Sequence, residues 1–489
     1  MGSTKNQLAK GVFWNALQMV VNQSFSFGLR LVLAKLLFPE QFGIVGMATV
    51  FTGFVQILTE LGIGAALIQR KEEQLTPKHY FTAFWTGVIW SVLLFILMSL
   101  VVAPLAASFY GEPILELLIP VISIGILVSP VNLINKTQLT KKMDFKRIAK
   151  IDNFATISAG ILSFILALNG AGVWALAFNS TAIIVISIPF YFSATKWYPK
   201  LTWSTDAFKD IFGFGVYATG TNIINYVISN IDYLLIGKLL NAQILGAYTL
   251  AFVLTDTFRN RLTAVMNNVM YPIYGEKQND HSAIKGYYLK VIEYNSIVVY
   301  PSMTFMLVFA SPFINAVFGD KWDLAVSPLR ILAGSVIFSM MVNSNTVLIR
   351  GLGFARLELK LQVLKSIIFA PSLIAGIYYG GIIGASWVIL LNKIFAVVLA
   401  QYTFNHLINI RITTNEFLRA LRNPLIAGGV SLVIGYVFFL VKTNFVIGGI
   451  AMFSSYCIAI WFLMKNEIVN EINKIRKKRT AHQSVTCID

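Results

Sequence analysis

The chain has 489 residues, of which 56% are hydrophobic and only 12% are charged. A soluble protein of this size cannot hide so much apolar surface in its core, so the composition excludes an ordinary globular protein and predicts a membrane protein. The formal net charge is +17, but the basic residues are scattered over short connections, which argues against a nucleic-acid-binding surface.

Apolar segments long enough to cross a bilayer follow one another along almost the whole chain. A spanning helix needs about 20 mostly apolar residues, and such segments form helices because lipid offers no partners for backbone N–H and C=O groups. The alternating polarity of barrel strands is not found. The sequence predicts fourteen transmembrane helices, at residues 12–36, 42–69, 80–108, 114–136, 148–168, 172–195, 211–237, 243–272, 288–311, 326–349, 358–379, 382–404, 424–441 and 445–464.

The basic residues predict the orientation of these helices. Lys and Arg accumulate in cytoplasmic loops, and most of the 39 Lys and Arg residues fall on one side when the N-terminus is placed in the cytoplasm. The connection at 136–150 and the tail at 474–479 are the most basic examples. An even number of helices then places both termini in the cytoplasm.

Cysteine and histidine are too sparse to indicate a disulfide or a metal site. Cys457 lies in the last predicted helix and Cys487 in the tail that follows it. The four histidines are far apart in the sequence. We therefore expect neither a metal nor a cofactor, other than a coupling ion such as H⁺ or Na⁺.

An internal repeat divides the chain. The segment LAKLLFPEQFGIVGMA at 33–48 aligns without a gap with IGKLLNAQILGAYTLA at 236–251, so that Gly43 matches Gly246. Six predicted helices separate the copies, so both run in the same direction, as in transporters built from two bundles about an axis along the membrane normal. Chance alignment of small and apolar residues is the competing explanation. The repeat predicts an N-lobe at 1–200, a C-lobe at 201–410, and a final helix pair with a basic tail at 411–489.

Ionisable side chains occur inside the predicted helices, where an uncompensated charge costs several kcal/mol. Lys393 lies near the middle of its helix, and Asp256 near the middle of another. Such groups face a water-filled cavity or a partner. We expect a substrate cavity lined by Arg30, Lys393, Arg259, Asn22 and Asn225, and ion-coupling carboxylates at Glu60, Asp256 and Asp232.

Each of these residues also has a structural explanation. Asp256 and Arg259 have helical spacing and can neutralise one another, and Asp232 can lie at the outer headgroups. The asparagines can form interhelical hydrogen bonds. If the cavity is real, its cations suit an anionic group such as a diphosphate, and the charge state of the carboxylates biases an inward-open or outward-open arrangement.

Nine short stretches resemble the bacterial polysaccharide transporters known as Wzx-type flippases, of the multidrug/oligosaccharidyl-lipid/polysaccharide exporter superfamily, and most of all their colanic-acid and teichuronic-acid branch. None of the stretches is a catalytic signature. They are KGVFW at 10–14, LAKLLFPEQFGIVGMA at 33–48, ELGIGAALIQRK at 60–71, FTAFW at 81–85, FYGEP at 109–113, QLTKKMDFKR at 138–147, NGAGVWAL at 169–176, DYLLIGKLLNAQILGAY at 232–248 and FGDKW at 318–322.

The resemblance implies fourteen helices in two six-helix bundles plus a C-terminal pair. It implies alternating-access export of an undecaprenyl-diphosphate-linked oligosaccharide from the cytoplasmic to the periplasmic leaflet of the bacterial inner membrane, for O-antigen, capsule or exopolysaccharide synthesis. Membrane lipids, a polysaccharide polymerase and glycosyltransferases are the implied partners, and a monomer suffices. Family members hold the diphosphate with cationic cavity residues; Arg30 and Lys393 are assigned here by depth. Lys35 stands where the family usually has Arg.

Two other functions fit parts of the pattern. A multidrug or cation antiporter of the same superfamily would have a cavity dominated by carboxylates and aromatic residues, whereas this chain mixes Lys and Arg with acids. A membrane enzyme acting on lipid-linked sugars would need catalytic groups in a sizeable outer loop. The predicted outer connections are short, and the longest, around 319–327, contains only Asp320 and Asp323.

Overall fold

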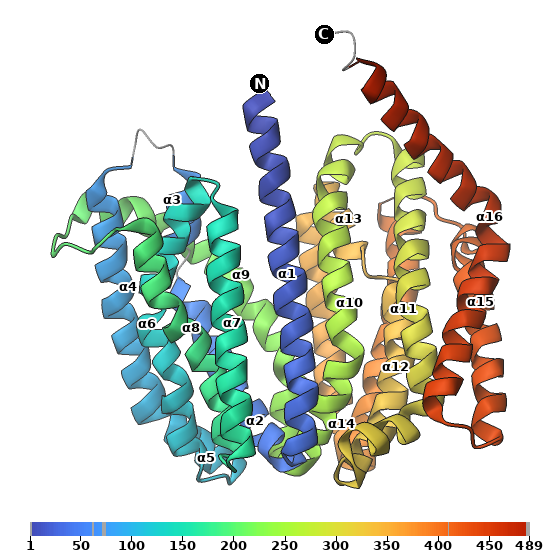
Figure 1. The fold of residues 1–489 in the computed structure, drawn as a ribbon, viewed down its shortest axis with the longest axis horizontal. Coiled ribbons are helices and arrows are strands. Elements are labelled where there is room, and N and C mark those ends of the chain that lie inside the picture. Colours follow the sequence, from blue (N-terminus) through green and yellow to red (C-terminus); the bar gives the residue numbers. More distant parts are fainter. Residues whose placement is uncertain (1, 61–62, 71–74, 409, 486–489) are drawn as a thin grey trace. The chain divides into compact units, whose positions relative to one another are not determined.

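The computed structural model describes residues 2–60, 63–70, 75–408 and 410–485, and this part of the chain consists of helices and connecting turns without any strand (Figure 1). The chain forms two compact units. Unit 1 contains residues 1–250 and 318–322, and unit 2 contains 251–317 and 323–489. The lobe boundaries at 200 and 410 derived from the repeat stay a prediction.

Unit 1 is built from nine helices and the beginning of a tenth. They are α1 (Gly2–Leu36), α2 (Pro39–Glu60), α3 (Ile63–Gln69), α4 (Pro77–Leu97), α5 (Ala103–Tyr110), α6 (Leu115–Lys141), α7 (Phe145–Leu168), α8 (Val173–Thr195), α9 (Thr205–Leu239) and the first part of α10 (Ala242–Glu276). A π-helical turn at Met98–Val102 joins α4 to α5.

Unit 2 contains the rest of α10 and the remaining helices. They are α11 (His281–Phe318), α12 (Val326–Met340), α13 (Asn345–Gly351), α14 (Ala355–Tyr402), α15 (Thr414–Leu440) and α16 (Phe445–Val485). A 3-10 turn at Asp320–Ala325 precedes α12, and a π-helical turn at Thr403–Leu407 follows α14. Phe318, the last residue of α11, and residues 320–322 of the 3-10 turn belong to unit 1.

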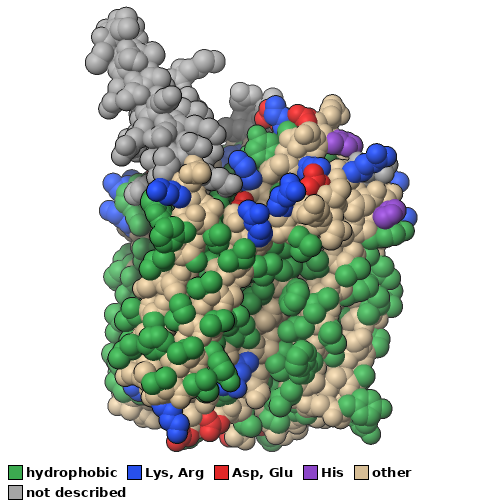
Figure 2. All heavy atoms as spheres, turned by 90° about the vertical axis from the view of Figure 1, so that its right-hand side faces the viewer, with side chains coloured by type: hydrophobic (Ala, Val, Ile, Leu, Met, Phe, Trp, Pro, Cys, Tyr) green, Lys and Arg blue, Asp and Glu red, His purple; other side chains and the backbone are tan. Residues whose placement is uncertain are grey.

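Ten helical segments of the described residues are long and apolar enough to cross a membrane, so the chain is a multi-pass membrane protein. One of them, Ala355–Leu407, covers two of the predicted spans, and α14 bends between these at Gly381, whose φ is +55°. On the face in Figure 2, hydrophobic side chains cover the middle, whereas charged side chains gather at the two ends. Apolar side chains around a whole helix are typical of lipid-facing and buried spans.

Helix ends follow local sequence signals. The Ser204 hydroxyl accepts a hydrogen bond from the Ala207 N–H at the start of α9, and Thr413 and Glu416 form a capping box at the start of α15. These side chains satisfy N–H groups that have no partner inside the helix.

In unit 1, α6 packs against α4 and α8, and α7 packs against α1 and α8. In unit 2, α12 packs against α14, and α15 against α16. A buried cluster that includes Tyr274, Tyr288 and Phe404 joins the C-terminal part of α10 to α11 and to the end of α14. This cluster makes the end of α10 a rigid part of unit 2.

Two glycines allow an unusually close approach of helices in unit 1. A Cβ added to Gly43 of α2 would lie 1.7 Å from the Ala242 carbonyl oxygen at the start of α10, and a Cβ added to Gly246 of α10 would lie 1.7 Å from the Pro39 carbonyl oxygen at the start of α2. Only glycine permits backbone contact this close. The starts of α2 and α10 therefore touch through two matching backbone contacts.

Two aromatic side chains pack against the helices that end beside this contact. The Trp322 indole, in the 3-10 turn after α11, donates a hydrogen bond of 2.8 Å to the Ala34 carbonyl oxygen near the end of α1. A Cβ added to Gly237 near the end of α9 would lie 2.9 Å from the ring of Tyr110, the last residue of α5. The ends of α1 and α9 are thus each covered by an aromatic side chain from another element of unit 1.

Candidate functional site

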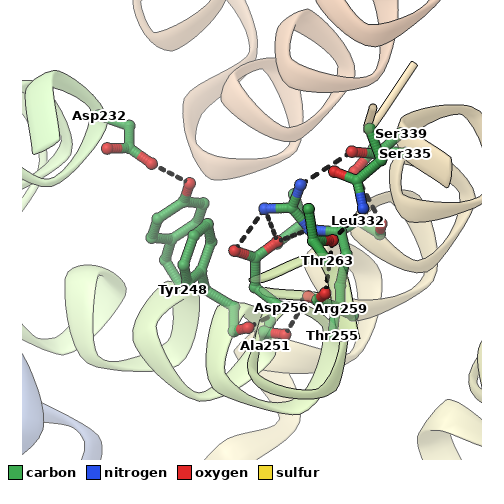
Figure 3. Close-up of polar contacts among 12 residues, drawn as sticks. Asp232, Tyr248, Ala251, Thr255, Asp256, Arg259, Thr263, Leu332, Ser335 and Ser339 are labelled. Carbon is green, nitrogen blue, oxygen red and sulfur yellow. Dashed lines mark hydrogen bonds and ion pairs between the residues drawn. The ribbon is translucent and has the colours of Figure 1, made fainter. Parts of the chain in front are cut away.

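Two largely buried charges of unit 2 form an ion pair on α10 (Figure 3). The Arg259 Nε donates to Asp256 Oδ1 and its Nη2 to Asp256 Oδ2, both at 2.6 Å. The Nη1 donates to the Ser339 hydroxyl of α12 at 2.8 Å. The side chains are 14% and 9% exposed for Arg259 and Asp256. The spacing of three residues therefore produces the ion pair that the sequence allowed, and the pair reaches across to a second helix.

Polar side chains continue from this pair along one face of α10. Thr263 donates to the Arg259 carbonyl oxygen and accepts from the Asn343 amide, which lies in the turn after α12. One turn further, Asn267 lines a pocket with residues of α13. We call this row the α10 polar seam; it comprises Asp256, Arg259, Thr263, Asn267 and Tyr271 on α10, and Ser339, Asn343, Thr346 and Arg350 on α12, α13 and the turn between them.

The seam occupies one side of α10 because its members recur every three or four residues. With a rise of 1.5 Å per residue, it extends about 22 Å along the helix. The part from Asp256 to Thr263 is hydrogen-bonded. Polar and ionisable groups over this distance are costly to place in a lipid-facing position and are typical of a substrate or ion pathway. The seam can therefore hold polar cargo or conduct ions along α10.

A second buried carboxylate lies in unit 1. Asp232 of α9 is 7% exposed, and the Tyr248 hydroxyl of α10 donates to its Oδ2. The residue is thus inside the protein, in a hydrogen bond that joins α9 to α10, rather than at an exposed headgroup position.

Among the side chains that the structure describes, no hydrogen bond or ion pair joins Arg30, Asn22 and Asn225 to one another. Arg30 is exposed on α1, Asn22 and Asn225 are partly buried on α1 and α9, and Lys393 is partly buried on α14. The Oδ1 of Asn22 has no hydrogen-bond partner among the described residues. The side chain of Glu60 lies outside the described residues. The roles assigned to these five residues stay predictions.

The sequence interpretation missed a polar cluster around Asp152 in unit 1. One carboxylate accepts hydrogen bonds from three helices: from Gln18 of α1 at 2.5 Å, from Lys136 of α6 at 2.8 Å and from the Tyr191 hydroxyl of α8 at 2.6 Å. The available signal was an aspartate inside the predicted span 148–168. The cluster fixes α7 to its three neighbours.

Asp152→Asn is expected to lower the stability of the protein in detergent. The amide cannot accept all three hydrogen bonds as a carboxylate does, and the loss of a hydrogen bond to a charged group costs about 1.5–3 kcal/mol. Thermal unfolding of the purified variant should show a lower midpoint than the wild type, whereas Asp320→Asn, at an exposed position, should leave the midpoint unchanged. Equal midpoints for both variants would contradict the structural importance of this cluster.

Metal ligands do not gather among the residues that the structure describes. In these ranges, no group of three or more His, Cys, Asp or Glu side chains is placed to hold a metal ion. The coupling ion stays a prediction.

Comparison with known proteins connects this architecture to polysaccharide assembly. Residues 32–327 match the model of the polysaccharide biosynthesis protein family. The chain is 27% identical to the teichuronic acid biosynthesis protein TuaB of Bacillus subtilis, with 88% of this chain and 90% of that protein covered. It is 25% identical to the lipopolysaccharide biosynthesis protein WzxC of Escherichia coli, with 82% and 81% covered.

A solved structure shares the fold. The lipid II flippase MurJ in an inward closed conformation superposes with a TM-score of 0.68 over 94% of this chain and 100% of that chain, at 14% sequence identity. The family model covers more than half of the residues, and the helices, their apolar surface and this shared fold agree with it. The chain belongs to the polysaccharide biosynthesis protein family.

Proposed function

We propose that this protein is a flippase that moves lipid-linked oligosaccharides from the cytoplasmic to the outer leaflet of the bacterial cytoplasmic membrane. The substrate would be an undecaprenyl-diphosphate-linked repeat unit that is later polymerised into O-antigen, capsule or exopolysaccharide. The names of the relatives, which refer to teichuronic acid and lipopolysaccharide biosynthesis, support this substrate class. The fold shared with a lipid II flippase supports a transport mechanism.

The observation that carries the proposal is the α10 polar seam. Asp256, Arg259 and Thr263 are hydrogen-bonded to one another and to α12 and the turn after it, and polar residues continue on the same side of α10 to Tyr271, over about 22 Å in all. In a membrane, such a row supports a substrate or ion pathway. Sugars and phosphates need hydrogen-bond donors and acceptors throughout their passage. A lipid tail can stay in the bilayer while the polar head follows such a seam.

We also propose fourteen transmembrane helices with both termini in the cytoplasm. The ten apolar segments account for eleven of the predicted spans, because Ala355–Leu407 contains two. The other three spans fall on α1, α9 and α10, which are each 35 residues long. At about 1.5 Å per residue, each is long enough to cross a bilayer.

The paired glycine contacts support a parallel repeat of two bundles. In the alignment of the two copies, Pro39 corresponds to Ala242 and Gly43 to Gly246. Gly43 touches Ala242 while Gly246 touches Pro39. A two-fold relation between the copies would produce a reciprocal contact of this kind.

The aromatic contacts beside the glycines support the same relation. Ala34, beneath Trp322, corresponds in the alignment to Gly237, beside Tyr110. We assign this contact to the outer end of the protein, where it closes the pathway on that side. Alternating access requires the two helix starts to separate when the cargo leaves.

The assigned cavity residues would have three different roles. Arg30, Lys393 and Arg259 would attract the diphosphate, Asn22 and Asn225 would bind its oxygens or the sugars, and Glu60, Asp256 or Asp232 would carry a proton or Na⁺. A polysaccharide polymerase and glycosyltransferases would act before and after this protein, which would work as a monomer. A drug or cation antiporter is the alternative, since a buried carboxylate such as Asp256 also suits a cationic substrate.

Complementation separates the two functions. In a bacterium that lacks its own flippase and accumulates the lipid-linked repeat unit, the protein is expected to restore polymer on the cell surface and to confer no export of a cationic dye. Dye export without polymer would support the antiporter instead.

Loss of the assigned cations gives a sharper prediction. Arg30→Ala and Lys393→Ala are each expected to reduce surface polymer at least about tenfold, which corresponds to about 1.4 kcal/mol of lost interaction with the diphosphate. Surface polymer is measured at equal amounts of membrane-inserted protein, with Lys442→Ala as the control for an exposed cation. Normal polymer from both variants would refute the cationic cavity.

A further inference from the structure

Unit 2 contains a pocket at one end of the α10 polar seam. Its volume is about 270 Å³, and its lining consists of Asn267 and Tyr271 of α10 with Thr346, Val347 and Arg350 of α13. Four of the five lining residues carry an amide, a hydroxyl or a guanidinium group. A ligand there would meet several hydrogen-bonding groups, one aromatic ring and one cation.

The walls of the pocket are held in place from behind. The Tyr288 hydroxyl donates to Asn345 Oδ1 at the start of α13, and the hydroxyls of Tyr274 and Ser344 lie 3.2 Å apart. A Cβ added to Gly351 would lie 2.8 Å from the Tyr274 Cβ, so the end of α13 is in close contact with α10. The lining residues are therefore preorganised by a packed core, which lowers the entropy cost of binding.

One cation, Arg350, lines the pocket, and its ion-pair partner is the buried acid Glu358 of α14, which lies outside the lining. The Arg350 Nε and Nη2 both donate to one oxygen of Glu358, at 3.2 and 3.0 Å. A guanidinium has five N–H donors, and the Arg350 side chain is 41% exposed while that of Glu358 is 10% exposed. Two of the five donors face Glu358, so Arg350 keeps donors for an external anion.

The size and chemistry of the pocket select one kind of ligand. A guanidinium binds phosphate oxygens in a forked geometry, while the Asn267 amide and the Thr346 hydroxyl suit sugar hydroxyls. Tyr271 is 52% exposed and offers a ring for a sugar to pack against. Pockets for drug-sized molecules are about 300–1,000 Å³, so this one holds a single sugar phosphate rather than an oligosaccharide.

We propose that this pocket binds the sugar phosphate portion of the lipid-linked cargo before it enters the α10 polar seam. The inference rests on the proposed function for the identity of the cargo. Asn267 and Tyr271 belong to the seam and to the pocket, so a sugar phosphate bound here is already at one end of the row that leads to Arg259. The pocket lies near the C-terminal end of α10, which is cytoplasmic in the proposed topology, where the cargo is made.

Binding of glucose 1-phosphate to the purified full-length protein tests the site. Titration calorimetry or ligand-observed NMR should detect saturable binding of glucose 1-phosphate, with weaker binding of glucose and of inorganic pyrophosphate, since each lacks one half of the recognised group. A lipid-linked glucosyl phosphate in nanodiscs should compete with glucose 1-phosphate. Competition by the soluble compound UDP-glucose with no competition by the lipid-linked one would overturn the assignment to the cargo.

The test variants must not leave the negative charge of buried Glu358 without a partner. Arg350→Gln alone leaves Glu358 without its partner, so the decisive variant is Arg350→Gln/Glu358→Gln, with Thr346→Val as a milder change. We expect at least a tenfold loss of affinity in the double variant and a smaller loss in Thr346→Val. The matched control is Arg356→Gln, which removes an exposed cation of α14 and should bind as the wild type does. Equal affinity in the double variant and this control would overturn the proposal.

Failure of this site is distinguishable from failure of the proposed function. If the wild type restores surface polymer but the double variant binds glucose 1-phosphate normally, the pocket assignment is wrong and the flippase stands. If the wild type restores no polymer, the flippase is wrong whatever the binding result, and the assignment of the pocket to lipid-linked cargo falls with it.

Discussion

Asp256→Ala is expected to destabilise the protein by about 3–5 kcal/mol, because it leaves the Arg259 guanidinium buried without its carboxylate. The Ser339 hydroxyl is the remaining hydrogen-bond partner that the structure places on that guanidinium, and a neutral hydroxyl does not compensate its charge. Thermal unfolding in detergent should show a lower midpoint and partial aggregation of this variant. The surface pair of Lys277 and Glu276, with side chains 46% and 74% exposed, supplies the control: Glu276→Gln should unfold like the wild type.

The double variant Asp256→Ala/Arg259→Met separates stability from transport. Replacing a buried ion pair by apolar groups often restores stability, so its midpoint should return close to that of the wild type. We nevertheless expect transport to fall at least about tenfold, since Arg350 at one end is then the only charged member of the seam that can bind cargo or ions. A double variant that is stable and transports normally would show that the ion pair is only structural.

Gly43→Ala and Gly246→Ala are expected to open the end of the protein where α2 and α10 begin. A new Cβ at either position meets a backbone carbonyl oxygen at 1.7 Å, whereas real Cβ contacts essentially never fall below 3.0 Å. Backbone cannot move aside as a flexible side chain does, so the helix starts must separate by more than an ångström. Such overpacking costs about 1–3 kcal/mol, which favours any state in which the contact is absent.

Spin labels at Phe38, between α1 and α2, and at Leu239, the last residue of α9, measure this separation. Phe38 and Leu239 are exposed beside the contact, and cysteines there can be labelled after Cys457 and Cys487 are replaced by serine. The distance distribution should shift to longer values in Gly43→Ala and Gly246→Ala. Gly28→Ala is the matched control, since a Cβ on Gly28 meets nothing within 4 Å. An unchanged distribution in both test variants would exclude the glycine contact as the closure.

Much of the fold follows from hydrophobic segments, because backbone groups in lipid have to pair within a helix. The spans at 358–379 and 382–404 were predicted as separate helices, and the structure places both on α14 with a bend at Gly381. A glycine inside an apolar run predicts a weak point, but not whether the chain bends or ends its helix there. Helix α1 begins at Gly2, ten residues before the predicted span, because a helix can continue beyond the apolar segment into polar residues.

The site was less predictable, because contacts between helices do not follow from one helix at a time. The Asp256 and Arg259 pair has a local spacing and could be expected. Ser339 lies 80 residues away from Arg259, and no local pattern links them. Arg30 and Lys393 were predicted as cavity residues because they lie deep within predicted spans. Helices that are apolar all round, however, do not reveal which side faces lipid and which side faces a cavity.

The most direct test of the account is the movement of a lipid-linked oligosaccharide across reconstituted vesicles. The lipid is incorporated with the purified protein, and a membrane-impermeant glycosidase added outside measures how much substrate is exposed over time. The account predicts that vesicles with the wild-type protein expose the inner-leaflet pool, while protein-free vesicles and vesicles with Asp256→Ala/Arg259→Met keep it protected. Exposure by the wild type at the rate of protein-free vesicles, with and without a proton or Na⁺ gradient, would contradict it.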